Sequence, residues 1–131
     1  FPDEAPQGAS YLYFVGERPD AGAFEGYLAE HPGAIDFWLG GHTHTNPDDR
    51  TGGRSHVERK WGVNFLNVAA LTRHHVGPMP SPPMSRLLTF TEGSPDVSIE
   101  CYLHTADHAP VGWYEPARRL VRCRHPFRGP S

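Results

Sequence analysis

Cysteine is scarce in this sequence, and long apolar runs are absent. Cys101 and Cys123 are its two cysteines, too few for a disulfide framework and without a metal-binding spacing. We interpret them as thiols, at least one of them in a strand. No apolar run approaches the roughly 20 residues of a membrane-spanning helix, and no signal-peptide pattern opens the chain. We therefore expect a cytoplasmic protein with no membrane partner.

No charge of one sign dominates the chain. Lys and Arg number 12 and Asp and Glu number 15, which leaves a net charge of −3, so nothing predicts a nucleic-acid-binding surface. The hydrophobic share is only 37%, and 14 Pro and 14 Gly predict long irregular stretches around few elements. The 131 residues suffice for one domain with a core. The first residue is Phe rather than Met, from which we expect a piece of a longer protein.

The first forty residues predict a strand, a helix and a second strand. After a polar, disordered lead-in at 1–10, residues 11–15 (Tyr-Leu-Tyr-Phe-Val) have the pattern of a buried strand. Asp20 can cap a helix over Ala21–Glu30, and residues 35–39 form the second strand. This order is typical of the βαβ unit of a partly parallel sheet.

The remainder predicts mostly β structure. A polar loop over 45–60 leads to a strand at 61–71 and then to a proline-rich connection. Glu-Gly-Ser-Pro-Asp at 92–96 separates two strand patterns, at 86–91 and 97–103, and so indicates a hairpin. The tail at 104–131 is expected to be irregular, with one possible edge strand in 118–122. The fold class predicted is α+β, with an α/β-like start, then mostly β, and few helices.

The chain is organised around an apolar run that stops at Gly40 and Gly41 and then presents His42 and His44. If the chain stays extended, the two histidines project to the same side with Cα atoms roughly 7 Å apart. That spacing suits one metal bound by both rings, or two metals about 3.5–4 Å apart that take one ring each. Neutral imidazole suits zinc, iron, nickel or manganese, so His42 and His44 are predicted metal ligands.

Gly41-His42-Thr43-His44 follows an apolar strand and precedes a polar loop and a further strand at 63–69. This arrangement resembles the last metal-binding block of the calcineurin-like metallophosphoesterases, in which the first histidine binds one metal of a dinuclear centre and the second binds the other. The resemblance covers residues 11 to about 102. It implies that 11–103 are the C-terminal part of a metallophosphoesterase domain, a partial two-sheet sandwich with a flanking helix.

The resemblance also implies an activity, the hydrolysis of phosphoric esters. Two divalent metals would polarise the phosphoryl oxygen and lower the pKa of a bound water, which would then attack phosphorus in line. His42 and His44 would hold metal without transferring protons, so no catalytic residue is assigned. Asn46 and Arg50 lie where the phosphate ester would bind and are candidate substrate ligands; solvated loop residues are the alternative. Monoester, diester and nucleotide substrates are all compatible with this interpretation.

Most of the family's ligand set is absent from the chain. No Asp-x-His, Gly-Asp-x-x-Asp or Gly-Asn-His occurs. Glu17 stands where another ligand histidine is expected, and at most one of His74 and His75 can join a shared site. We therefore expect the isolated chain to be inactive and to need the N-terminal half of its domain, or self-association. The remaining histidines outside the helix end are interpreted as surface residues: His56, His104, His108 and His125.

Other interpretations use the same histidines. A non-catalytic metal-binding or interaction module is the main alternative. A cupin barrel also carries His-x-His, with Asp48 or Asp49 as its acidic residue, but the predicted helix argues against it. An amidohydrolase motif is excluded because five residues, rather than one, separate Asp36 from His42, and because the chain is too short for a barrel of about 250 residues.

Overall fold

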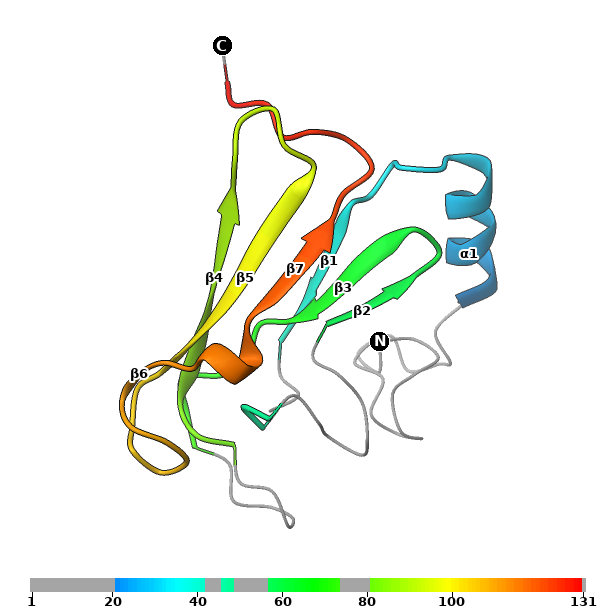
Figure 1. Cartoon of the computed structure of the whole chain (residues 1–131). Helices are drawn as coiled ribbons and strands as arrows, with labels where there is room; N and C mark the ends of the chain where they lie inside the picture. The colour runs from blue at the N-terminus through cyan, green and yellow to red at the C-terminus, as the bar shows by residue number, and fades with distance from the viewer. Residues whose placement is uncertain (1–20, 42–45, 49–56, 74–80, 131) are drawn as a thin grey trace.

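The computed structural model describes residues 21–41, 46–48, 57–73 and 81–130, and its described part is α+β with few helices, as predicted (Figure 1). Helix α1 comes first and is followed by seven strands and the 3-10 helix η2. The bounds are α1 Ala21–Glu30, β1 Phe37–Gly40, β2 Val57–Lys60, β3 Val63–Asn67, β4 Met84–Phe90, β5 Asp96–Leu103, β6 Gly112–Trp113, η2 Glu115–Ala117 and β7 Arg119–Arg122.

The first sheet has the order β1-β3-β2, with β1 parallel and β2 antiparallel to the central strand. Trp61 and Gly62 connect β2 to β3 with φ angles of 50° and 79°. Positive φ at both positions of a two-residue loop is the type I′ turn that suits the twist of a hairpin. All five residues of β3 are buried, which is expected for a central strand whose sheet is covered on both faces.

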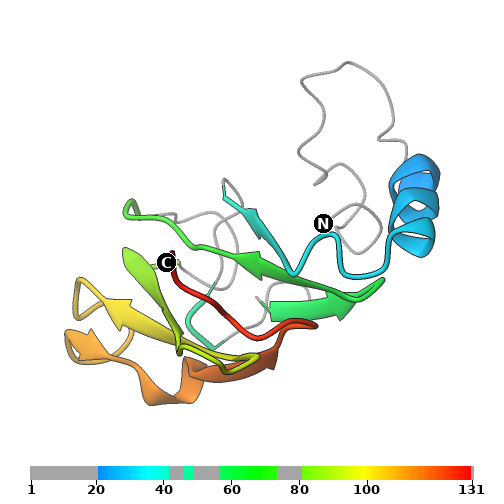
Figure 2. The same cartoon turned by 90° about the horizontal axis from the view of Figure 1, so that it is seen from above.

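Helix α1 covers the face of the first sheet that lies away from the second sheet (Figure 2). Leu28 of α1 is buried between the helix and the sheet. The ring centroid of Phe24, also in α1, lies 5.1 Å from that of Trp38 and 6.0 Å from that of Trp61. Tyr27 is half exposed, and its ring packs against His31. The predicted helix bounds are confirmed.

The second sheet is built on the β4–β5 hairpin, which is confirmed where the sequence predicts it. Residues of β5 alternate between half-buried and buried along the strand, the pattern of a sheet with one face on the core. That core consists of Ala69, Met84, Cys101, Leu103 and Ala117. Both cysteines are free thiols, and Cys101 lies buried in β5, as predicted.

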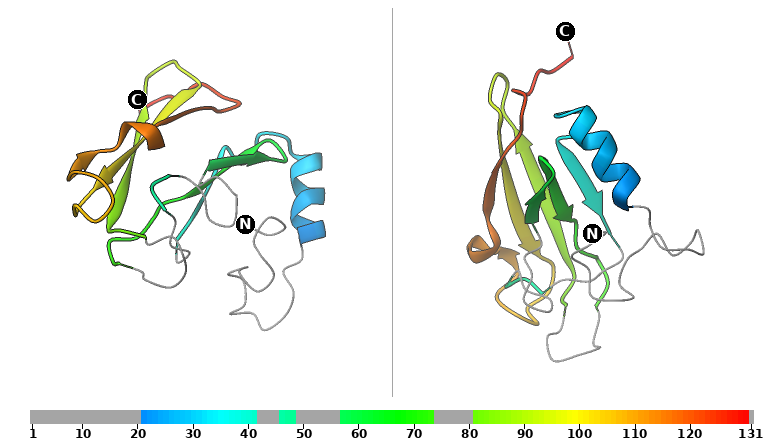
Figure 3. Two further views of the ribbon diagram at one scale, coloured as in Figure 1. Left: turned by 60° about the horizontal axis from the view of Figure 1, so that its bottom comes forward. Right: turned by 90° about the vertical axis from the view of Figure 1, so that its right-hand side faces the viewer.

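The second sheet lies on the face of the first sheet that is opposite to α1 (Figure 3). Polar and aromatic side chains join the two sheets. Phe37 of β1 packs against Phe90 of β4 at 5.9 Å between centroids. Beyond β7, the Arg124 amide donates to Asp36 Oδ1 at 2.7 Å. The tail also returns to the hairpin turn, where the amide of Gly93 donates to the carbonyl of Phe127.

Several predicted bounds are wrong. The loop expected over 45–60 contains β2, because Val57–Lys60 completes a hairpin with β3. The strand expected over 61–71 is shortened to Val63–Asn67 by the turn before it and by Asn67 after it. The tail contains β6 in addition to the expected edge strand, now β7. The strand predicted at 11–15 lies outside the described residues. No described helix is long and apolar enough to cross a membrane.

Candidate functional site

The carboxyl ends of β1 and β3 form the edge at which His42-Thr43-His44 begins, a segment that we call the histidine block. Gly40 is in register with Asn67, and the amide of Val68 donates to the Gly40 carbonyl at 2.9 Å. Because parallel strands end at the same edge of their sheet, side chains that follow β1 and β3 emerge together, as at the ligand sites of α/β proteins. Gly41 is the last described residue before the block and is exposed.

Packing among the described residues does not require the two glycines of this edge. Of the described atoms, none lies within 4 Å of a Cβ built at Gly40, and a Cβ at Gly41 would meet Val68 Cγ2 at an ordinary 3.8 Å. Neither glycine has a positive φ. The described residues therefore leave space beside both glycines, and a glycine backbone allows a metal or a phosphate to approach closely.

Backbone strain occurs at the same edge, just after β3. Ala69 has a φ of 69°, in the left-handed region, and is almost fully buried. This conformation costs a non-glycine residue about 1–2 kcal/mol. Asn67 holds it in place, because its Oδ1 accepts a hydrogen bond of 2.8 Å from the Ala69 amide. Asn67, the last residue of β3, thus also stabilises the chain that follows the strand.

The predicted site residues are only partly described. His42, His44 and Arg50 lie outside the described residues, as do Glu17, His56, His74 and His75. Asn46 is described and is 4% exposed. Its Oδ1 accepts a hydrogen bond of 2.8 Å from the Asp48 amide, so this oxygen stabilises a turn. Asn46 as a phosphate ligand stays a prediction.

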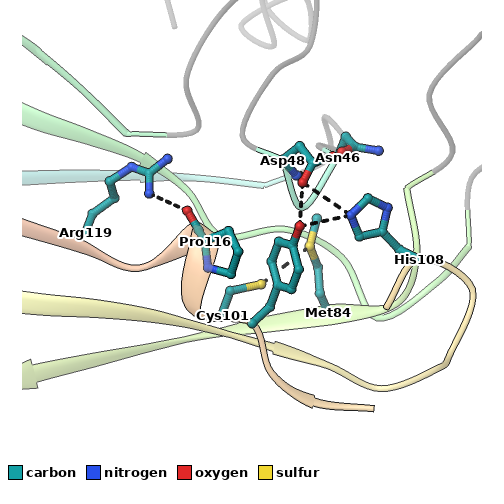
Figure 4. Close-up of polar contacts among 8 residues, drawn as sticks. Asn46, Asp48, Met84, Cys101, His108, Pro116 and Arg119 are labelled. Atoms are coloured by element: carbon teal, nitrogen blue, oxygen red, sulfur yellow. Dashed lines mark hydrogen bonds and ion pairs between the residues drawn. The ribbon is translucent and has the colours of Figure 1, made fainter. Parts of the chain in front are cut away.

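Asp48 belongs to a cluster that the sequence did not reveal (Figure 4). The Tyr114 hydroxyl donates to Asp48 Oδ1 at 2.6 Å, and His108 Nε2 lies 3.3 Å from the same oxygen. His108 Nε2 is also 3.4 Å from the Tyr114 hydroxyl. His108, interpreted from the sequence as a surface residue, is half-buried, with a side chain that is 20% exposed and contacts both partners.

These contacts shift two pKa values in opposite directions. The hydrogen bond from Tyr114 lowers the pKa of Asp48 below its usual value; partial burial opposes this shift, and the nearby His108 adds to it. The bond to Asp48 raises the pKa of Tyr114, and burial and the negative charge of Asp48 act in the same direction. At neutral pH the pair is therefore a carboxylate that accepts from a protonated phenol.

Tyr114 has a fixed position on the core of the second sheet. Its amide donates to the Cys101 carbonyl at 2.8 Å, and its ring packs against the cluster that contains Met84 and Ala117. Asp48 and Tyr114 are separated by 66 positions. No local motif joins them, so only a prediction that already contained β6 and η2 would have found the pair.

Within the described part of the chain, no group of three or more His, Cys, Asp or Glu side chains could hold a metal ion. The predicted ligands His42 and His44 lie outside these residues and stay a prediction. Two neutral imidazoles would form one part of a transition-metal site.

No protein-family model, curated protein or solved structure matches this chain. The resemblance to the metallophosphoesterases therefore rests on the residues alone and stays a prediction.

Proposed function

We propose that this chain is the C-terminal portion of a metal-dependent phosphoesterase and supplies two metal ligands, His42 and His44, to a dinuclear centre. The observation that carries the proposal is the position of the block. It begins directly after Gly41, at the carboxyl edge of the parallel β1–β3 pair, where the described residues leave space beside both glycines. Asn46, two residues after His44, stays the candidate contact to the phosphate ester, with Arg50 beside it.

The role of the chain in this reaction is to bind and orient. When bound, the two metal ions supply Lewis acidity at the phosphoryl oxygen. His42 and His44 hold them as neutral imidazoles, and the buried turn at Asn46 carries the chain away from the block. The other ligands would come from the N-terminal half of the same domain, which this sequence does not contain.

The direct test uses a longer protein that includes the 131 residues together with the preceding half of its domain. Purified with Mn²⁺, it should hydrolyse bis(p-nitrophenyl) phosphate or p-nitrophenyl phosphate. Replacing His42 and His44 by Ala should remove both bound metal and turnover. His125→Ala is the matched control, since its ring is exposed and lies 3.7 Å from Asp36 on another part of the fold.

The alternative is a non-catalytic metal-binding or interaction module. The observation in its favour is the absence of Asp-x-His, Gly-Asp-x-x-Asp and Gly-Asn-His from the sequence. If the longer protein retains its metal and its rate after both histidine substitutions, the block is structural and the phosphoesterase proposal is wrong. If the histidines bind metal but no phosphoester is hydrolysed, the module is supported instead.

A further inference from the structure

An open groove of about 340 Å³ lies between an edge strand of the first sheet and an edge strand of the second. In the part of the chain that the structure describes, β2 pairs only with β3 and β7 only with β5, so each strand has one edge without a partner. Val57 and Arg59 line the groove from β2, and all four residues of β7 line it from the other side.

The groove has a positive charge, because its described lining contains three arginines and no carboxylate. Arg59 is exposed, and its Nη1 donates to the carbonyl of Arg122 in β7. The Arg122 side chain has an ion pair of 3.1 Å with Asp96 Oδ1, and the side chain of Arg122 is 69% exposed. The third arginine, Arg119, donates from Nη1 to the carbonyl of Pro116 at 2.9 Å. These bonds hold the guanidinium groups in place and leave their positive charge at the groove.

The charges are spread along the groove rather than collected at one point. Arg119 and Arg122 are the first and last residues of β7, so their Cα atoms are roughly 10 Å apart at 3.3–3.4 Å per residue. Arg59 lies at the Arg122 end, since it bonds the carbonyl of that residue. The apolar side chains of Leu120 and Val121 lie between the two ends. This arrangement suits an elongated ligand with negative charge at both ends and an apolar middle.

The main chain of β7 also faces the groove. The Arg122 carbonyl accepts from Arg59 of the first sheet and therefore points away from β5. The amide of Cys123 points the opposite way, because it donates to the carbonyl of Pro95, directly before β5. Backbone groups alternate in direction along a strand, so the amide and carbonyl of Leu120 point to the same side as those of Arg122. An extended peptide can pair with such groups, as in complexes in which a peptide adds a strand to a sheet edge.

We propose that the groove between β2 and β7 binds an extended acidic segment of another protein. Its acidic side chains bind Arg59 at one end and Arg119 at the other, since a guanidinium group matches the two oxygens of a carboxylate. Its main chain pairs with Leu120. A nucleic acid fits less well, because nucleic-acid sites commonly contact about 6–10 phosphates, whereas this groove has three arginines in a chain of net charge −3.

The experiment measures the fluorescence anisotropy of a labelled peptide, Gly-Glu-Glu-Val-Val-Glu-Glu-Gly, as the 131-residue chain is added. The same peptide with Gln in place of every Glu is the control ligand. We expect saturable binding of the acidic peptide, and weaker binding as salt is raised from about 0.05 M to about 0.5 M, because salt screens exposed charges. Equal binding of the two peptides would contradict the proposal.

Arg59→Gln and Arg119→Gln test the two ends of the groove. Each substitution removes one exposed ion pair with the peptide and should weaken binding about fivefold; the double variant should bind about 25-fold more weakly if the ends act independently. Arg118→Gln is the matched control, since it removes the same charge beside the groove from a side chain that pairs with Glu115. The proposal fails if neither groove variant weakens binding, or if Arg118→Gln weakens it as much as they do.

NMR spectra of the unmodified chain test the proposal if a variant does not fold. Addition of the acidic peptide should shift the backbone amide signals at 57–59 and 119–122, and shifts confined to other residues would overturn the proposal. A labelled oligothymidylate that binds more tightly than the acidic peptide would assign the groove to nucleic acid and would also overturn it. Since no metal is added and neither His42 nor His44 is changed, these results are independent of the proposed function.

Discussion

Asn64 of β3 donates from Nδ2 to the carbonyl of Arg122 in β7 at 3.2 Å, and thereby joins the first sheet to the second. The same amide group lies 3.2 Å from the carbonyl of Asp36, which precedes β1. Asn64 is 2% exposed, so water cannot replace these bonds. A side chain that satisfies two backbone carbonyls between sheets fixes their relative position as well as contributing to stability.

The first prediction concerns this junction. Asn64→Ala removes the Nδ2 group that donates to the carbonyls of both Asp36 and Arg122. Each carbonyl keeps another donor, the backbone amide of residue 64 and the Arg59 guanidinium respectively, so the free energy of unfolding should fall by about 1 kcal/mol. Urea denaturation followed by tryptophan fluorescence measures it. Thr89→Ala, at an exposed position of β4, is the control and should change the free energy by no more than about 0.5 kcal/mol. Equal stability of Asn64→Ala and the control would mean that Asn64 does not join the sheets.

Ala69 provides the second prediction. A β-branched residue at its φ of 69° is an outlier conformation, so Ala69→Val should destabilise the fold by about 2 kcal/mol or more. Ala69→Gly relieves about 1–2 kcal/mol of backbone strain but loses about 0.8 kcal/mol of methyl burial and gains unfolded-state entropy. These terms nearly cancel. Urea midpoints should therefore place Ala69→Gly close to the parent chain and Ala69→Val well below it; the reverse order would contradict the strained conformation.

The third prediction is the pH dependence of the Asp48–Tyr114 bond. Since the folded pKa of Asp48 lies below its ordinary 3.8, the bond contributes stability above that pH and loses it as pH falls through the lower folded pKa. Since the folded pKa of Tyr114 lies above 10.0, the contribution is present below that pH and is lost as pH rises through the folded value. The coupling energy from a Tyr114→Phe and Asp48→Ala cycle should be present at neutral pH and should be lost in acid, as pH falls below 3.8 and through the lower folded pKa of Asp48. A coupling that persists in acid would refute the assignment of the carboxylate as acceptor.

Sequence patterns predicted correctly those helices and strands that depend on residues close together in the sequence. The helix Ala21–Glu30 and the β4–β5 hairpin follow from periodicity and from turn residues between strands, and both are confirmed. The short strands β2 and β6 were missed because they form only by pairing with other strands. Strand β2 pairs with β3, and β6 pairs with only two residues of β5. Tertiary pairing overrides weak local propensity in strands of this length.

The same division applies to the candidate site. The strand β1, which ends at Gly40, was predictable because an apolar run is followed directly by two glycines in the sequence. The cluster of Asp48, His108 and Tyr114 was not predictable, because its members come from three separate connecting segments and lie up to 66 positions apart. Hydrophobicity and spacing carry no information about such a contact until the register of β5 with β6 is known.

The fourth prediction concerns activity and metal in the isolated chain. With two ligands of a dinuclear site, the 131-residue chain should show no hydrolysis of p-nitrophenyl phosphate above the rate of free metal. It should bind Co²⁺ weakly, and more weakly as pH falls through about 6.5, because each ring must be neutral to ligate. Turnover by the purified chain that is abolished in His42→Ala would show that the chain already contains a complete site.

The fifth prediction follows from the edge of the first sheet. In the part of the chain that the structure describes, β1 pairs only with β3, and Trp38 and Leu39 of β1 are 40% and 53% exposed. An open edge with exposed apolar side chains favours pairing with another strand. We therefore expect the isolated chain to self-associate in multi-angle light scattering, and to become monomeric when the N-terminal half of the domain is supplied.

Leu39→Lys places a charge at this edge and should reduce self-association, whereas Leu120→Lys, at an exposed position of β7, should have little effect. A monomer at every concentration tested, with a cooperative melt, would show that the edge is already covered within the chain.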